Sequence, residues 1–126
     1  MSNENYTLES LYAASKRDAD LEVDLRDIDR ELAEDLEALE PHGIGFPAPL
    51  FMTTCALKEA KIVGKTGQHL SVILSQDGER RKGIGFGLGK TKIESNLLYR
   101  CYYRIGLETW NGATSVSCFV QRVEPV

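Results

Sequence analysis

The sequence predicts a mainly β protein in which a five-stranded barrel follows an N-terminal helical segment. Two observations carry this prediction. Apolar residues recur every three or four positions in the first third of the chain and alternate with polar residues later on, which are the periods of a helix and of a half-buried strand. Dipeptides that favour tight hairpin turns, Asp77-Gly78 and Asn111-Gly112, then divide the alternating part into strands.

Two helices are expected before the barrel. A short one covers residues 6–16, and a clearer one covers residues 27–39. Pro41 ends the second helix, because the residue before a proline disfavours the helical conformation. We expect one apolar stripe of this helix to pack against protein. The stripe consists of Leu25, Ile28, Leu32, Leu36 and Leu39.

Five strands are expected after a stiff connector that is rich in proline and glycine. Their ranges are 50–63, 68–75, 80–87, 97–107 and 114–123. A longer polar segment separates the third strand from the fourth, which is typical of an OB-type barrel. Inward-facing residues are expected in the second strand and the third. They are Leu70, Val72 and Leu74, followed by Ile84 and Phe86.

Charge is unevenly distributed along the 126 residues, although the net charge is only −4. Residues 1–41 hold 4 basic and 13 acidic side chains, whereas residues 42–126 hold 11 basic and 6 acidic ones. We therefore expect three parts: an acidic helical lead-in over 1–41, a connector over 42–49 and a basic barrel over 50–126. A basic half of this kind indicates a nucleic-acid surface.

The glycine-rich stretch Gly83–Thr91 resembles a phosphate-binding loop but does not meet its requirements. Counted back from Gly89-Lys90-Thr91, the first glycine of G-x-x-x-x-G-K-[ST] belongs at position 84, where Ile84 stands. No substantial helix follows, although such a helix is needed to bind the phosphates. We interpret the stretch as a barrel strand whose glycines permit bending and close backbone approach.

The strand over 97–107 suggests how a nucleic acid is bound. One face carries Tyr99, Cys101, Tyr103 and Ile105, which suit a barrel interior. The other face carries Leu98, Arg100, Tyr102 and Arg104. Two guanidinium groups beside an aromatic ring match the way single strands are held, with cations on phosphates and rings on bases. The alternative interpretation is an ordinary polar outer face, partly covered by the tyrosine.

Further basic residues lead into the first turn, and others lie in the third strand and in the loop that follows it. They complete the set of predicted nucleic-acid contacts. The full set is Lys58, Lys61, Lys65, Arg80, Arg81, Lys82, Lys90, Lys92, Arg100, Tyr102 and Arg104.

No catalytic, metal or cofactor site is expected in this chain. Its two histidines, His42 and His69, lie apart, and no Asp/His cluster has metal-ligand spacing. The cysteines Cys55, Cys101 and Cys118 are scattered and form no C-x-x-C pair, so we expect buried, reduced thiols. No run of residues is apolar and long enough for a membrane span. The N-terminus lacks the pattern of a secretory signal, and a cytoplasmic location is expected.

Four stretches of the chain, within residues 20–126, resemble the C-terminal region of RecJ-type single-stranded-DNA exonucleases. The proline-rich connector is the most specific of them, and a last strand ending in VEPV follows the fourth. Ser71 stands where that family often has a lysine, so one phosphate contact is missing. The stretches are LEALEPHGIGFPAPLF (Leu36–Phe51), KIVGKTGQHLSV (Lys61–Val72), GIGFG (Gly83–Gly87) and YYRIGLETWNG (Tyr102–Gly112).

The resemblance implies a single-stranded-DNA-binding module of a 5′-to-3′ exonuclease that acts in DNA repair or recombination. In that family the metal-dependent chemistry belongs to Asp-His-His domains upstream, so the module would be a fragment or a detached homologue without its own active site. Its partners would be single-stranded DNA and the catalytic domains. Two alternatives stay open: a module that docks onto a replication or repair protein, and an RNA-binding OB protein. Stacking and phosphate contacts do not separate DNA from RNA.

Overall fold

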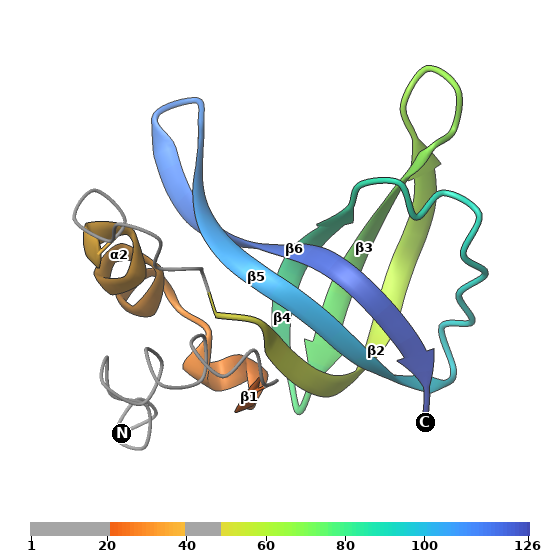
Figure 1. The fold of residues 1–126 in the computed structure, drawn as a ribbon, viewed down its shortest axis with the longest axis horizontal. Helices are drawn as coiled ribbons and strands as arrows, with labels where there is room; N and C mark the ends of the chain where they lie inside the picture. Colours follow the sequence, from red (N-terminus) through yellow and green to blue (C-terminus); the bar gives the residue numbers. More distant parts are fainter. Residues whose placement is uncertain (1–20, 40–48) are drawn as a thin grey trace.

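A computed structural model of the chain describes residues 21–39 and 49–126. The expected helix over 6–16 lies outside these residues, as does the connector up to residue 48. Figure 1 shows the arrangement of the elements. In chain order they are β1 (Leu21–Glu22), the short 3-10 helix η1 (Leu25–Asp27), α2 (Arg30–Leu39), β2 (Phe51–Val63), β3 (His69–Gln76), β4 (Glu79–Gly85), β5 (Leu98–Trp110) and β6 (Ala113–Pro125).

The five long strands form a closed barrel in the order β2-β3-β4-β6-β5, which is completed by pairing of β2 with β5. All of these neighbours are antiparallel except β4 and β6, which are parallel. The OB-like five-stranded barrel predicted from the sequence is therefore confirmed. Each strand begins within one residue of its expected start. The strand β1, which pairs with β2 over two residues, was not expected.

The two predicted turn dipeptides adopt the backbone that hairpins need. Asp77 and Gly78 have φ values of 49° and 84°, and Asn111 and Gly112 have 53° and 80°. Positive φ at both central residues is the mark of a type I′ turn, whose twist matches that of the flanking strands. The second turn joins β5 and β6 into a long hairpin whose tip extends beyond the barrel (Figure 1).

The barrel interior is filled by alternate residues of each strand. Leu70, Val72 and Leu74 of β3 are buried as predicted, and so are Tyr99, Cys101 and Tyr103 of β5, whereas Ile105 is only partly buried against the core. Inside the barrel, the hydroxyl groups of Tyr103 and Thr53 lie 2.7 Å apart, and the Thr53 hydroxyl also donates to the Val23 carbonyl at 2.9 Å.

The predicted orientation of β4 was wrong. Gly83 and Gly85 face the interior, and Phe86, beyond the strand, is 65% exposed. A Cβ atom on Gly83 would lie 2.6 Å from Leu74 Cδ1, and one on Gly85 would lie 2.7 Å from Leu88 Cδ1. The interior beside these positions is already full, so only glycine fits there. Strand alternation then places Ile84 and Phe86 outside.

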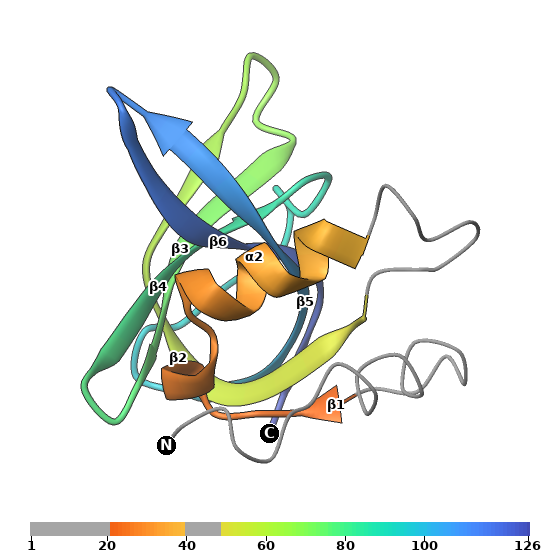
Figure 2. The same cartoon turned by 90° about the vertical axis from the view of Figure 1, so that its left-hand side faces the viewer.

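The helix α2 lies across one end of the barrel (Figure 2). It begins at Arg30, three residues later than predicted, because Asp29 caps it: the Leu32 amide donates to Asp29 Oδ1 at 2.9 Å. Leu32 and Leu36 are buried and belong to the same apolar core as the barrel interior. The packed stripe is confirmed for these two residues and for Leu25 and Ile28, which precede the helix and are buried in the same core, whereas the side chain of Leu39 lies outside the described part. No helix of the described residues is long and apolar enough to cross a membrane.

The three cysteines are buried and unpaired, as expected. Burial raises the pKa of the Cys118 thiol to about 12. A hydrogen bond with Cys55 and burial together raise the pKa of Cys101 far above its usual range. Thiols that stay protonated are poor nucleophiles and poor metal ligands, so Cys101 and Cys118 act as core residues.

Asp27 is a buried carboxylic acid, 4% exposed, whose Oδ1 accepts no hydrogen bond from the described residues. Burial raises its pKa above the usual value, and the nearby Arg26 guanidinium offsets part of that effect. The Asp27 carboxyl group therefore binds a proton more tightly in the folded protein than in the unfolded chain. The stability that results is complete below about pH 4 and is lost as the pH rises through the folded-state pKa.

Replacing Asp27 by asparagine is expected to raise the free energy of unfolding at pH 7, because the amide cannot ionise. The gain should shrink as the pH falls from 7 to 4, because a larger fraction of the wild-type carboxyl is then protonated. Urea denaturation at both pH values measures the difference, with Asp35→Asn on the exposed face of α2 as the control. An Asp27→Asn variant less stable than wild type at pH 7 contradicts the assignment.

Candidate nucleic-acid interface

One line of paired residues crosses the outside of all five barrel strands. Directly paired residues of neighbouring strands point to the same side of a sheet, so these five side chains lie next to one another. A basic residue stands at each end, and a serine, an aliphatic residue and an aromatic residue stand between them. From β2 to β5 this outer row consists of Lys61, Ser71, Ile84, Phe119 and Arg104, each paired with the next.

Two exposed aromatic residues lie on the same side of the barrel wall as the outer row. Phe86 follows Ile84 by two residues and makes an edge contact with His69, with ring centroids 5.2 Å apart. The Gly87 amide donates to His69 Nδ1 at 3.0 Å and so fixes this pair. Trp110 ends β5 on the same side as Arg104 and is 78% exposed. Large exposed rings beside cations are typical of surfaces that stack bases.

We call the outer row together with its neighbours the candidate face. Its further members come from β3, β4, β5 and the start of the β4–β5 loop. They are His69, Lys82, Phe86, Glu108 and Trp110.

Lys65, Lys90 and Lys92 are exposed or partly exposed on two neighbouring segments, the β2–β3 turn and the β4–β5 loop. Gly89 holds the segments together, because its amide donates to the Gln68 carbonyl at 3.0 Å. A Cβ atom on Gly89 would collide with the backbone oxygen of Gly67. The close backbone approach predicted for the glycine-rich stretch therefore occurs, and it places three lysines near one end of the candidate face.

Three other predicted contacts are engaged within the protein. The Lys58 ammonium group donates to the Ser95 carbonyl at 2.8 Å, and Arg80 forms a 2.6 Å ion pair with Glu59. Arg81 donates through Nε to the Ile28 carbonyl at 2.6 Å and pairs with Glu79 at 3.0 Å. It therefore ties the segment before α2 to β4.

The predicted trio on β5 is divided. Tyr102 is only 8% exposed, because the Arg122 guanidinium lies 3.8 Å from the centre of its ring. Its hydroxyl group donates to Glu124 at 3.1 Å. Arg100 is exposed beside this pair, and Arg104 belongs to the outer row. The Tyr102 ring is thus covered on its outer side, whereas Phe86 and Trp110 are open.

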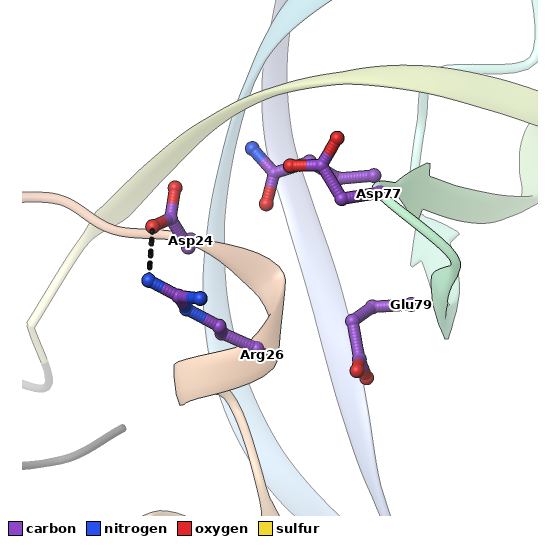
Figure 3. Close-up of a pocket in the computed structure, with 5 residues that line it drawn as sticks. Asp24, Arg26, Asp77 and Glu79 are labelled. Atoms are coloured by element: carbon purple, nitrogen blue, oxygen red, sulfur yellow. Dashed lines mark ion pairs between the residues drawn. The ribbon is translucent and has the colours of Figure 1, made fainter. Parts of the chain in front are cut away.

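A pocket near the β3–β4 turn has the opposite character (Figure 3). It is lined by Asp24, Arg26, Gln76, Asp77 and Glu79. Its single guanidinium group, that of Arg26, lies 3.8 Å from Asp24 Oδ2. The remaining carboxylates make this pocket unfavourable for phosphate. Within residues 21–39 and 49–126, no group of His, Cys, Asp and Glu side chains is arranged to hold a metal ion.

A family model, the RecJ OB domain, matches residues 19–122. The chain belongs to the RecJ OB domain family. The resemblance seen in the sequence is thereby confirmed. Comparison with the curated proteins gave no match.

Solved structures share the fold of this RecJ OB domain. RecJ from Thermus thermophilus, solved in complex with Mn2+, is 23% identical with a TM-score of 0.60, and the match covers 76% of this chain and 14% of that one. The Mg2+ complex of the same protein is 22% identical with a TM-score of 0.56, and the match covers 76% of this chain and 14% of that one. A Leishmania major Friedlin protein described as an aspartyl-tRNA synthetase is 5% identical with a TM-score of 0.60, over 83% of this chain and 20% of its own. This RecJ OB domain thus corresponds to a small part of each.

Sequence reasoning missed the aromatic members of the candidate face in this RecJ OB domain. Phe86 was assigned to the interior, and Phe119 and Trp110 were not singled out. The available signal was the pair Gly83 and Gly85 at the end of β4, since two inward glycines two positions apart leave Ile84 and Phe86 to point outward. The position of Phe119 could not be predicted from the sequence, because its ring packs over Gly106 on the neighbouring strand. A Cβ atom on Gly106 would lie 2.8 Å from Phe119 Cε2.

Proposed function

We propose that this RecJ OB domain binds single-stranded DNA across the candidate face. The outer row carries the proposal, because it offers a cation at each end of a strip of serine, isoleucine and phenylalanine, with exposed rings beyond it. Cations follow the phosphates of a single strand while rings stack on its bases. OB folds bind oligonucleotides on the second and third strands and on the loops beside them. In this chain those elements are β3, β4 and the turns after β2 and β5.

We further propose that the domain works as part of a RecJ-type 5′-to-3′ exonuclease, in the cytoplasm, during DNA repair or recombination. The catalytic centre and its metal would belong to other domains, since the chain covers 14% of Thermus RecJ. The domain would help to hold the strand beside that centre. Labelled single-stranded DNA kept with the purified chain and Mn2+ should stay intact, and metal-dependent cleavage lost on mutating this chain's carboxylates would overturn this assignment.

Fluorescence anisotropy with a labelled oligonucleotide tests the binding proposal. Affinity should fall as salt rises, because cations that neutralise phosphates release counterions, with a log–log slope of about −0.7 per phosphate contact. Lys61→Ala removes one end of the outer row and should make the slope shallower by about 0.7. Arg26→Ala, in the acidic pocket, is the matched control and should leave the slope unchanged. An affinity independent of salt would contradict the proposal.

A protein-docking function has one specific observation in its favour. Leu97, Leu98 and Val126 are 43%, 54% and 67% exposed, and the Val126 amide lies 3.4 Å from the Leu98 carbonyl oxygen. They form an apolar patch around the end of the barrel. The protein-docking function is supported if no oligonucleotide binds and the chain instead co-purifies with separately produced RecJ catalytic domains. Leu98→Asp should then abolish the association.

A further inference from the structure

A carboxylate lies within the candidate face, where a purely electrostatic binding surface would have none. Glu108 stands on β5 between Gly106 and Trp110, and these alternate residues point to the same side of the strand. Its Oε1 lies 3.8 Å from the ammonium group of Lys82 on β4. One negative charge is therefore placed among the groups proposed to hold a polyanion.

The Glu108 carboxylate is held in place. The Ser117 hydroxyl group donates to Glu108 Oε1 at 2.7 Å. Ser117 is 1% exposed, so its hydroxyl cannot move far. Both contacts involve Oε1, and the Glu108 side chain is 42% exposed. The face thus presents one fixed, negatively charged acceptor with an oxygen that a ligand can reach.

The chemistry of such an acceptor distinguishes the parts of a nucleic acid. A phosphate oxygen is itself a negatively charged acceptor and is repelled. The exocyclic amino groups of cytosine and adenine are donors, and carboxylates accept from them. Thymine and uracil carry a carbonyl oxygen where cytosine carries its amino group. A base edge with an amino group therefore satisfies Glu108, and a thymine edge does so poorly.

The spacing along β5 fits this role. Residues two apart on one face of a strand are about 6–7 Å apart, so a base stacked on the Trp110 ring has its edge within reach of Glu108. Lys82, next to the same carboxylate, can then meet the adjoining phosphate. We propose that Glu108, oriented by Ser117, reads the edge of a base stacked on Trp110 and favours bases with an exocyclic amino group. This inference rests on the proposed function of the candidate face.

Anisotropy with oligo(dC) and oligo(dT) of equal length, about 10 nucleotides, tests the inference at pH 7.5. Wild type should prefer oligo(dC) by about tenfold or more, the value of one hydrogen bond to a charged group. Glu108→Gln should bind both oligonucleotides more tightly and lose the preference, because the amide also donates to a thymine carbonyl. Ser117→Ala should weaken the preference while keeping the gross affinity.

Glu124→Gln is the matched control. Glu124 lies on the neighbouring strand and is bound to Tyr102 and Arg122, so its neutralisation changes the net charge equally without touching the reading site. It should raise both affinities and keep the preference. If wild type binds both oligonucleotides equally, or if Glu108→Gln keeps the dC preference, Glu108 does not read bases, although the proposed function survives. If wild type binds neither, the proposed function itself fails.

Discussion

Replacing Leu32 by alanine is expected to lower the free energy of unfolding by about 2–5 kcal/mol, the usual effect of emptying a buried leucine site. Leu32 is 4% exposed and lies in the same core as the barrel interior. The loss should appear in urea denaturation as a lower midpoint with an unchanged slope. A large effect would show that α2 closes the barrel as part of one folding unit.

The control for this measurement is Glu37→Ala on the exposed side of the same helix. It alters helix propensity and surface charge but no packing, so a change within about 0.5 kcal/mol is expected. If Leu32→Ala lowers the free energy of unfolding no more than Glu37→Ala does, the helix is not part of the core.

The double variant Phe86→Ala/Trp110→Ala should weaken single-strand binding by about 2–6 kcal/mol, because each stacked base contributes about 1–3 kcal/mol. This corresponds to a rise in Kd of about 30-fold or more. Both rings are mostly exposed, so the melting temperature should hardly change. Anisotropy and thermal unfolding on the same preparation separate lost contacts from lost structure.

Leu97→Ala/Leu98→Ala removes a comparable exposed apolar area away from the candidate face and should bind like wild type. Weaker binding by this variant would mean that single-stranded DNA contacts Leu97 and Leu98, outside the candidate face. If the double aromatic variant binds normally while Arg100→Ala/Tyr102→Ala does not, single-stranded DNA binds along the part of β5 around Tyr102, which the sequence also predicts.

The barrel could be predicted because its signals are local. Alternation in β3 marked its interior residues, and the Asp-Gly and Asn-Gly pairs marked the hairpins, whose left-handed backbone the structure contains. These features depend on residues within a few positions of one another. The two-residue strand β1 carries no such signal, since its pairing depends on where β2 lies.

The candidate site was harder to predict because it depends on contacts between distant residues. Tyr102 looked like a stacking residue, but Arg122, twenty positions later, covers it. Phe86 looked like a core residue, but Leu74 and Leu88 already fill the space beside the inward glycines. Periodicity tells which residues share a face, whereas the side of the barrel on which that face lies depends on volumes that only the assembled core determines.

Titration of the isotopically labelled chain with single-stranded DNA is the most direct test of whether the nucleic acid lies on the outside of β3, β4 and β6. Amide chemical-shift changes in two-dimensional NMR spectra report which residues the strand touches. The largest changes are expected at Ser71, Ile84 and Phe119 and in the segments around Phe86 and Trp110. Changes confined to α2 or to the region around Tyr102 and Glu124, with the outer row unaffected, would contradict this placement.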